Sequence, residues 1–194
     1  MTTILSATQA PEKRAGLAKW KKRVGEAEAQ RIVTEASNVG SVMHNILEKW
    51  FKNEEYNPGN NMVHKQAKGM AQVVIDNVEP DISEVWGSEV MLVAKELYAG
   101  TTDLVGMYKG KPTIMDFKQT NKPKKREWID DYFMQGAAYA GAHNEMYGTD
   151  ISNIAVFMCS RAGEYQQFDI WPDEFDDWAQ EWWKRCEQYY EKHG

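Results

Sequence analysis

The stretch that decides the fold is residues 100–125, GTTDLVGMYKGKPTIMDFKQTNKPKK. Two segments within it, 100–108 and 111–119, are rich in Val, Leu, Ile, Thr and Tyr, which are typical of β-strands. The two residues between them, Lys109 and Gly110, suit a tight hairpin turn. The sequence therefore predicts two antiparallel strands whose register is fixed by that turn.

The register of this hairpin brings two carboxylates together. Counting back from a turn at Lys109-Gly110 places Asp103 opposite Asp116, with their Cβ atoms roughly 4.5–5.5 Å apart on one face. Opposed carboxylates repel each other unless a cation lies between them, and Mg²⁺ or Mn²⁺ prefers such oxygen-rich sites. Lys118, two residues after Asp116, projects from the same face. The alternative is an ordinary solvent-facing hairpin with a salt bridge to Lys118.

The rest of the chain reads as helices and strands around this hairpin. Asn38, Gly40 and Ser41 are expected to interrupt the first helical pattern, and Ser41 to cap the next helix. The predicted helices are 14–36, 41–52, 62–77, 127–147 and 173–192, and the predicted strands are 85–98, 100–108, 111–119, 151–160 and 164–171. The first three strands are expected to form an antiparallel meander.

These elements predict an α/β fold in which a mixed central sheet with an antiparallel meander is flanked by helices. With 194 residues and 42% hydrophobic content, the chain is expected to form a single domain, residues 1–194. Residues 1–80 would be its N-terminal helical part, and residues 85–171 its sheet core with the long helix 127–147. Residues 173–192 would be a C-terminal helix.

Charge and cysteine content narrow the class of protein. The net charge of −6 argues against a protein that coats nucleic acid by bulk electrostatics, but residues 109–126 carry seven Lys or Arg against one acid. Cys159 and Cys186 are far apart, which favours reduced core residues over a disulfide or a Cys-rich metal site. No long apolar run or secretory signal is evident, so a soluble, cytoplasmic protein without membrane contact is expected.

Several segments together resemble one known family. The hairpin is similar to the Gly-x-x-Asp and hydrophobic-Asp-x-Lys core of RecB-like nucleases in the PD-(D/E)XK superfamily, in particular the mitochondrial genome maintenance exonucleases and their phage-encoded relatives. NVGSVMHNILEKW (38–50) resembles the family's Gly-x-x-x-His helix, and QGAAYAGA (135–142) its Gln-x-x-x-Tyr helix. The likeness covers residues 2–160. Gln119 departs from the Thr or Ser common after the lysine, and the cysteine cluster of the iron–sulfur branch is absent.

The resemblance implies a restriction-endonuclease-like core and a role for each matching residue. Asp103 and Asp116 would ligate a catalytic Mg²⁺ or Mn²⁺, with the backbone carbonyl of Phe117 as a further ligand. Lys118 would orient the attacking water. His44 would bind metal through its neutral imidazole, although its helical spacing also fits a hydrogen-bonded core histidine.

The acid on the first strand is less certain from spacing. Glu89 matches the family's acidic position, and the resemblance implies that it is a metal ligand. A tight turn at Ala99-Gly100 would instead place Glu96 opposite Asp103, and a bulge would be needed for Glu89 to share that face. Glu89 is preferred, Glu96 is the alternative, and a surface acid is the third interpretation.

Contacts to phosphate are expected beyond the metal ligands. Gln135 and Tyr139, one helical turn apart, match the family's support or phosphate-contacting pair, although helix packing also explains Tyr139. The loop after the hairpin supplies four cations and one candidate for base stacking: Lys122, Lys124, Lys125, Arg126 and Trp128.

The function implied by the resemblance is a metal-dependent DNA exonuclease that hydrolyses phosphodiester bonds at single-stranded ends or flaps, in replication, repair or recombination. Its partners would be DNA and proteins of those processes, in a phage or bacterial setting. The N-terminal helices and residues 120–131 would form a cover that a free strand threads. The alternatives are a duplex-end recombination exonuclease, a non-catalytic DNA-binding module that keeps the fold, and a hydrolase of a small phosphorylated molecule.

Overall fold

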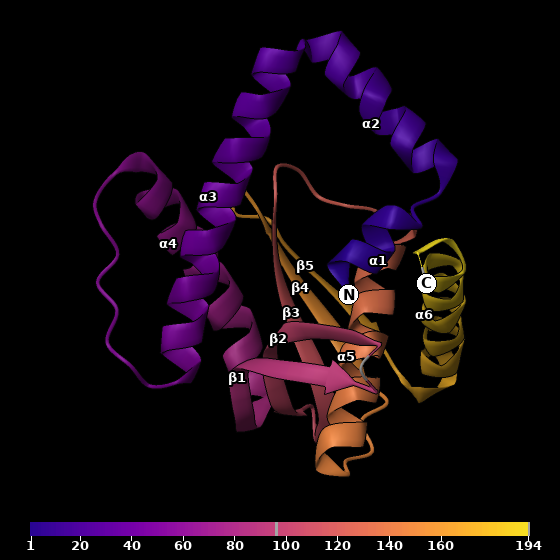
Figure 1. Ribbon diagram of the computed structural model, residues 1–194. Helices are drawn as coiled ribbons and strands as arrows, with labels where there is room; N and C mark the ends of the chain where they lie inside the picture. The colour runs from indigo at the N-terminus through magenta and orange to yellow at the C-terminus, as the bar shows by residue number, and fades with distance from the viewer. Residues whose placement is uncertain (96, 194) are drawn as a thin grey trace.

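A five-stranded sheet in the order β1-β2-β3-β4-β5 forms the centre of the fold (Figure 1). The computed structural model describes residues 1–95 and 97–193. The first three strands form the predicted antiparallel meander, β3 and β4 are parallel, and β4 and β5 are antiparallel. The strands are β1 (Ile82–Ala94), β2 (Tyr98–Tyr108), β3 (Lys111–Thr120), β4 (Ile154–Ser160) and β5 (Tyr165–Ile170). This topology confirms the predicted mixed sheet.

Helices cover both faces of the sheet. Buried side chains of α3 and α4 pack with those of β2, β3 and β4 in one core, while α5 and α6 pack on the opposite face in two further cores. The α-helices are α1 (Thr2–Ala7), α2 (Pro11–Val24), α3 (Glu26–Phe51), α4 (Met62–Val78), α5 (Asp130–Tyr147) and α6 (Pro172–His193). Two short 3₁₀ helices, Glu79–Asp81 and Arg126–Trp128, precede β1 and α5. In the described ranges, none of these helices combines the length and apolar character needed to cross a bilayer.

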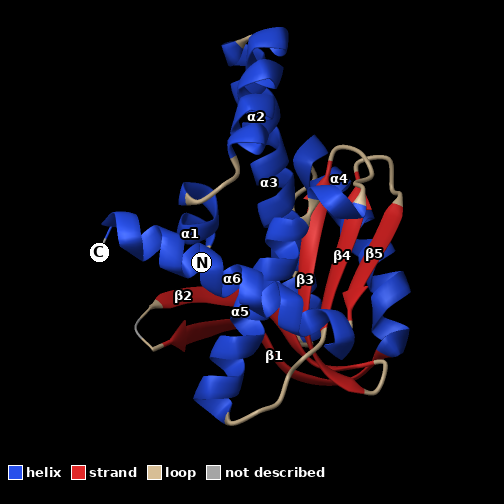
Figure 2. Cartoon of the chain, turned by 90° about the vertical axis from the view of Figure 1, so that its right-hand side faces the viewer, coloured by secondary structure: helices blue, strands red, loops and turns tan. Residues whose placement is uncertain are grey.

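The hairpin between β2 and β3 has the predicted turn and register. Lys109 and Gly110 both have positive φ angles, 47° and 73°, as a type I′ turn requires. Pairing runs from Tyr108 opposite Lys111 to Leu104 opposite Met115. Beyond that pair β1 and β2 turn away from the other three strands (Figure 2). The sheet therefore splits at the position of the two predicted aspartates.

The predicted break in the N-terminal helix is wrong. α3 runs without interruption through Gly40 and Ser41, so Ser41 is not a cap, and the break lies at Gly25, whose φ is 87°. A Cβ atom on Gly40 would lie 3.3 Å from Cγ of Gln119, so this glycine allows α3 to approach β3 closely. Packing against the sheet keeps the helix intact where local preference alone favoured an end.

The alternative turn at Ala99-Gly100, which would have favoured Glu96, is also wrong. Ala94 pairs with Tyr98, and both Ala99 and Gly100 belong to β2. The connection therefore lies at residues 95–97, and Glu96 lies outside the described residues. A Cβ atom on Gly100 would lie 3.1 Å from Cε1 of Tyr139, so this glycine serves close packing on α5 instead of a turn.

An arm formed by α2 and the N-terminal half of α3, residues 11–37, projects from the body of the molecule (Figure 1). α2 has no buried residue. Contacts at both ends fix the arm to the body. Lys13 forms an ion pair of 3.2 Å with Asp131 of α5, and Glu35 accepts a hydrogen bond of 2.9 Å from Arg161, in the turn between β4 and β5.

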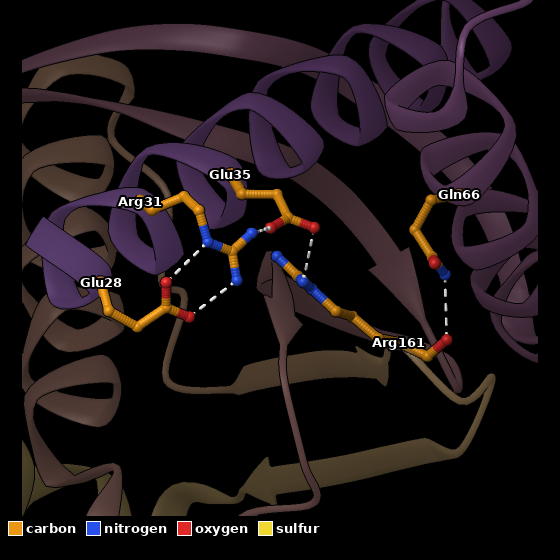
Figure 3. Close-up of polar contacts among 5 residues, drawn as sticks. All are labelled: Glu28, Arg31, Glu35, Gln66 and Arg161. Atoms are coloured by element: carbon orange, nitrogen blue, oxygen red, sulfur yellow. Dashed lines mark hydrogen bonds and ion pairs between the residues drawn. The ribbon is translucent and has the colours of Figure 1, made fainter. Parts of the chain in front are cut away.

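Around Glu35 the contacts form a chain of alternating charges, seen in Figure 3. Arg31 donates two hydrogen bonds of 2.8 Å to Glu28 and one of 3.0 Å to Glu35. The backbone carbonyl of Arg161 in turn accepts a hydrogen bond of 2.9 Å from Gln66 of α4. Arg161 therefore joins α3, α4 and the sheet at the base of the arm.

Candidate metal centre

Three possible metal ligands from three elements converge beside the split in the sheet. His44 of α3, Glu89 of β1 and Asp103 of β2 each offer one ligand atom, and these atoms all lie within 4.8 Å of one another. All three residues were singled out by the family resemblance. An imidazole nitrogen with two carboxylates is a donor set that divalent cations accept.

Glu89 reaches this group through the register of β1 and β2. Ser88 pairs with Leu104 and Val90 with Thr102, which leaves Glu89 opposite Asp103. Glu89 has a left-handed φ of 54°, and it lies outside the regular pairing. The pairing of Ala94 with Tyr98 sets the register in which Glu89 lies opposite the aspartate.

Where β2 leaves β3, the carboxylate of Asp103 replaces the backbone carbonyl that a paired strand would offer to β3. Its Oδ2 atom accepts a hydrogen bond of 2.7 Å from the backbone N–H of Phe117, and its Oδ1 atom lies 3.3 Å from Nδ1 of His44. Burial raises the pKa of Asp103, but the hydrogen bond from His44 and the nearby positive charges outweigh it, so the pKa is lowered. Burial conversely lowers the pKa of His44, and the bond to Asp103 outweighs it, so that pKa is raised.

The buried Asp116 forms an ion pair with the half-buried Lys118 next to this group. Nζ of Lys118 lies 2.5 Å from Oδ2 of Asp116, an atom that accepts no well-aligned hydrogen bond from any described residue. Burial, together with the charge of Asp103, raises the pKa of Asp116 to about 6 in spite of Lys118. Burial lowers the pKa of Lys118, but the two aspartates outweigh it and raise that pKa. Asp116 thus lies beside the three converging ligands but is engaged by the lysine.

The three converging residues line an open cleft of about 400 Å³. Its other walls come from the same face of α3. The full lining is Gly40, Ser41, His44, Asn45, Glu48, Glu89 and Asp103. Glu89 has a raised pKa because of burial and the charge of Asp103, which is the repulsion that a bound cation would remove. The donor set, the repulsion and the access from solvent fit a divalent metal ion.

The support residues predicted on α5 lie on the other side of the lysine. The ring centroid of Tyr132 is 5.1 Å from Nζ of Lys118. Gln135 donates a hydrogen bond of 2.9 Å to the hydroxyl of Tyr139, and both side chains are buried. Burial and the charge of Asp116 raise the pKa of Tyr139 to about 12. The pair therefore packs beneath the candidate site and does not line the metal cleft.

The predicted basic loop is only partly free for a ligand. Arg126 forms an ion pair of 2.5 Å with Glu174 and lies 4.9 Å from the ring centroid of Phe133. Lys124 exchanges two hydrogen bonds with Gln166 through its backbone. The exposed members of the set are Lys122, Lys125 and Trp128, with Nζ of Lys125 5.5 Å from the Trp128 ring centroid. None of the five residues lines the metal cleft.

The charge of α2 was not recognised from the sequence. This helix carries six basic residues against one acid, Glu12. The signal was present as the run KRAGLAKWKKR, but its placement in an arm with no buried residue depends on the tertiary structure. The basic residues are Lys13, Arg14, Lys19, Lys21, Lys22 and Arg23.

The chain is similar to known proteins in sequence and in fold. No family model matches the chain. It is 28% identical to mitochondrial genome maintenance exonuclease 1 of Mus musculus in a 206-residue alignment that covers 99% of this chain and 59% of the mouse protein. The chain thus spans somewhat more than half the length of that relative.

The fold is also similar to a crystal structure from Eubacterium rectale, of a protein assigned by inference as an exonuclease. The TM-score is 0.54 at 13% sequence identity, with 79% of this chain and 65% of that chain covered. At this identity the match concerns the fold alone. The sequence comparison therefore relates the chain weakly to an exonuclease, and the structural comparison supports the fold.

Proposed function

We propose that this chain is a divalent-metal-dependent deoxyribonuclease with a PD-(D/E)XK core, an exonuclease that hydrolyses phosphodiester bonds at single-stranded DNA ends or flaps. The observation that carries the proposal is the convergence of His44, Glu89 and Asp103 within 4.8 Å, directly beside the Asp116–Lys118 pair. The sequence similarity to an exonuclease supports the same reaction class.

The residues divide the work of the reaction. His44, Glu89 and Asp103 would hold Mg²⁺ or Mn²⁺, joined by Asp116 and the backbone carbonyl of Phe117. A bound divalent cation supplies a Lewis acid that polarises the phosphoryl oxygen and lowers the pKa of water.

Lys118 would act on the attacking water. Its ammonium forms an ion pair with the buried Asp116 and its pKa is raised, so it stays positively charged at neutral pH. A charged N–H donor can hold the water in line and offset negative charge that develops on the phosphate. Asp116, whose pKa is about 6, is ionised above that pH and keeps the lysine in place.

The arm supports a preference for single strands. α2 has six basic residues and no buried one, and the loop between β3 and α5 lies at the same end of the molecule (Figures 1 and 2). Basic side chains there can contact phosphates along the path of a strand. We propose that α2, α3 and residues 120–131 form a cover through which a free strand end threads, in DNA replication, repair or recombination.

The proposal is tested by digestion of 5′- and 3′-labelled linear single strands, with duplex and circular controls, in Mg²⁺, Mn²⁺ and EDTA. We expect metal-dependent loss of linear single strand by the wild-type chain and a fall of at least about a hundredfold in Lys118→Ala. Lys68→Ala is the matched control, because Lys68 is an exposed lysine of α4 that forms no ion pair with any described residue.

The other outcomes are informative. Cleavage of circular single strands as fast as linear ones would rule out the threaded cover. Preference for duplex ends would identify a recombination exonuclease. A folded wild-type chain that binds the strands but cleaves none would indicate a non-catalytic DNA-binding module.

A further inference from the structure

A groove lies between α1 and α5, and it shares no lining residue with the metal cleft. Its volume is about 220 Å³. Sites for drug-sized ligands measure about 300–1,000 Å³, so this groove has room for one smaller ring system. One face of each helix and the segment after α1 line it: Thr2, Leu5 and Ser6 from α1, Gln9 from the segment that follows α1, and Asp131, Tyr132 and Gln135 from α5.

The groove shares a wall with the proposed reaction centre. Tyr132 lines the groove, and its ring centroid lies 5.1 Å from Nζ of Lys118. That nitrogen is itself 2.5 Å from Asp116. A group held in the groove would therefore lie one side chain away from the phosphate on which Lys118 is proposed to act.

The groove does not repel a polyanion. Asp131 is the one acid among its lining residues, and cations flank both of its carboxylate oxygens. Oδ2 lies 3.2 Å from Nζ of Lys13, and Oδ1 lies 3.6 Å from a guanidinium nitrogen of Arg185. These ion pairs offset the charge of Asp131 before any ligand enters.

The chemistry of the walls suits a nucleobase. Leu5 and the ring of Tyr132 offer an apolar and an aromatic surface, and aromatic side chains stack on bases of any sequence. Within the described part of the chain, the side chains of Thr2, Ser6 and Gln9 make no hydrogen bond. Hydroxyl and amide groups both donate and accept, so they can meet the polar edge of each of the four bases.

From these observations we infer that the α1–α5 groove is a subsite for one base of the DNA strand, that of a nucleotide next to the scissile phosphate. The inference rests on the proposed nuclease function and deepens it. The groove binds without reading sequence, since its polar groups are adaptable and its stacking surface is not selective.

The test compares two single strands that differ only in their bases. Fluorescently labelled oligothymidylate and an all-abasic strand of equal length are titrated with the full chain in EDTA, where no cleavage occurs. Ser6→Leu fills the groove from α1, and Thr3→Leu is its matched control, an exposed hydroxyl residue of α1 that does not line the groove. Gln9→Ala removes the amide without filling the space.

We expect Ser6→Leu to weaken oligothymidylate binding by about tenfold, the loss of one stacked base, and to leave abasic-strand binding within about twofold. Gln9→Ala should weaken oligothymidylate binding by a smaller factor in the same selective way, and Thr3→Leu should change neither affinity. The subsite is overturned if Ser6→Leu and Gln9→Ala, both melting like the wild type, weaken the two strands equally or leave both unchanged.

Digestion by the wild type in Mn²⁺ separates the two proposals. A chain that discriminates the strands through Ser6 but cleaves neither would overturn the nuclease function and keep the base subsite. If the chain cleaves DNA but Ser6→Leu leaves its affinity for both strands unchanged, the nuclease function stands and the subsite is overturned.

Discussion

Glu89 adopts a left-handed backbone with φ of 54° inside an extended strand. For a residue with a Cβ atom this conformation costs about 1–2 kcal/mol, and such strain is concentrated at functional sites. We expect Glu89→Gly to keep its metal-free stability within about 1 kcal/mol of wild type, because relief of strain offsets the entropic cost of glycine. It should lose the stabilisation by Mn²⁺. Thermal unfolding in EDTA and in Mn²⁺ measures both effects.

The control for this prediction is Met91→Gly. Met91 lies two residues along β1, is 71% exposed and has no positive φ. It should lose about 0.5–1 kcal/mol in EDTA and keep the Mn²⁺ effect. If Glu89→Gly were as stabilised by Mn²⁺ as the wild type, Glu89 would not be a ligand.

Protons compete with a cation at His44 and Asp116. Burial lowers the pKa of His44, but Asp103 raises it more, and burial raises the pKa of Asp116 to about 6. Both groups are therefore protonated at acidic pH. They must lose these protons before a metal ion binds. We expect the Mn²⁺-induced rise in unfolding temperature to be much larger at about pH 8 than at about pH 5.5.

Without metal, these two groups make the folded chain less stable as the pH rises, whereas metal binding becomes stronger as the pH rises. Their folded pKa values exceed the unfolded ones, so the stability they contribute is present at low pH and is lost as pH rises, for Asp116 between about 4 and 6. Asp103, whose pKa is lowered, contributes stability that is lost as pH falls. His44→Asn should make the Mn²⁺-induced rise in unfolding temperature depend less on pH. An equal rise in the wild type at both pH values would contradict competition at this site.

At the scale of elements, the seating of α5 on the sheet depends on a glycine. A Cβ atom on Gly136 would lie 2.4 Å from Cγ2 of Ile154 in β4, and neither group can move freely. We expect Gly136→Ala to lower the free energy of unfolding by about 1–3 kcal/mol through overpacking.

Gly141 of the same helix provides the control. Its added Cβ atom would lie 3.5 Å from the hydroxyl of Tyr98, an ordinary contact. Gly141→Ala should therefore be neutral or stabilising by up to about 1 kcal/mol, because alanine favours the helix. Denaturant unfolding of both variants tests the pair, and equal stabilities would mean that α5 shifts without cost.

The junction of α3 with the β4–β5 turn should control the order of the arm. Glu35 bonds both Arg31 and Arg161 (Figure 3). We expect Arg161→Leu to speed amide hydrogen exchange in residues 26–38 by roughly fivefold to tenfold, the loss of one hydrogen bond between charged groups. Exchange in β3 and β4 should stay unchanged.

Lys184→Leu is the corresponding control. Lys184 forms an exposed ion pair with Glu181 within α6, far from the arm in sequence and contacts. Its loss should leave exchange in residues 26–38 unaltered. If amide hydrogen exchange in residues 26–38 were unchanged in Arg161→Leu, the junction would not hold the arm.

The molecule as a whole has a net charge of −6, yet its arm is basic. Each phosphate contact to single-stranded DNA contributes about −0.7 to the slope of log affinity against log salt concentration. We expect the triple variant Lys21→Gln, Lys22→Gln, Arg23→Gln to reduce the magnitude of that slope by up to about 2 and to weaken binding at low salt. Titrations at several salt concentrations measure the slope.

A second triple variant, Lys65→Gln, Lys68→Gln, Lys192→Gln, removes the same charge from α4 and α6. These three lysines are exposed and lie outside the arm. This variant should leave the slope close to that of the wild type. Equal losses in the two triple variants would mean that total charge, and not the arm, attracts the strand.

Features that depend on local spacing can be predicted from the amino-acid sequence. The type I′ turn at Lys109-Gly110 fixed the β2–β3 register, and the two-residue spacing of Asp116 and Lys118 placed both side chains on one face. Resemblance added His44 and Glu89, which the structure brings within 4.8 Å of Asp103.

Features that depend on contacts between distant segments could not be predicted in this way. Gly40 and Gly100 looked like a helix break and a turn, yet each is a glycine because another element packs against it. Asp103 and Asp116 do not form a continued strand pair, because the Asp103 carboxylate takes the N–H of Phe117 where the sheet splits. Local preference amounts to about 1 kcal/mol per residue, and close packing of a whole helix or strand outweighs it.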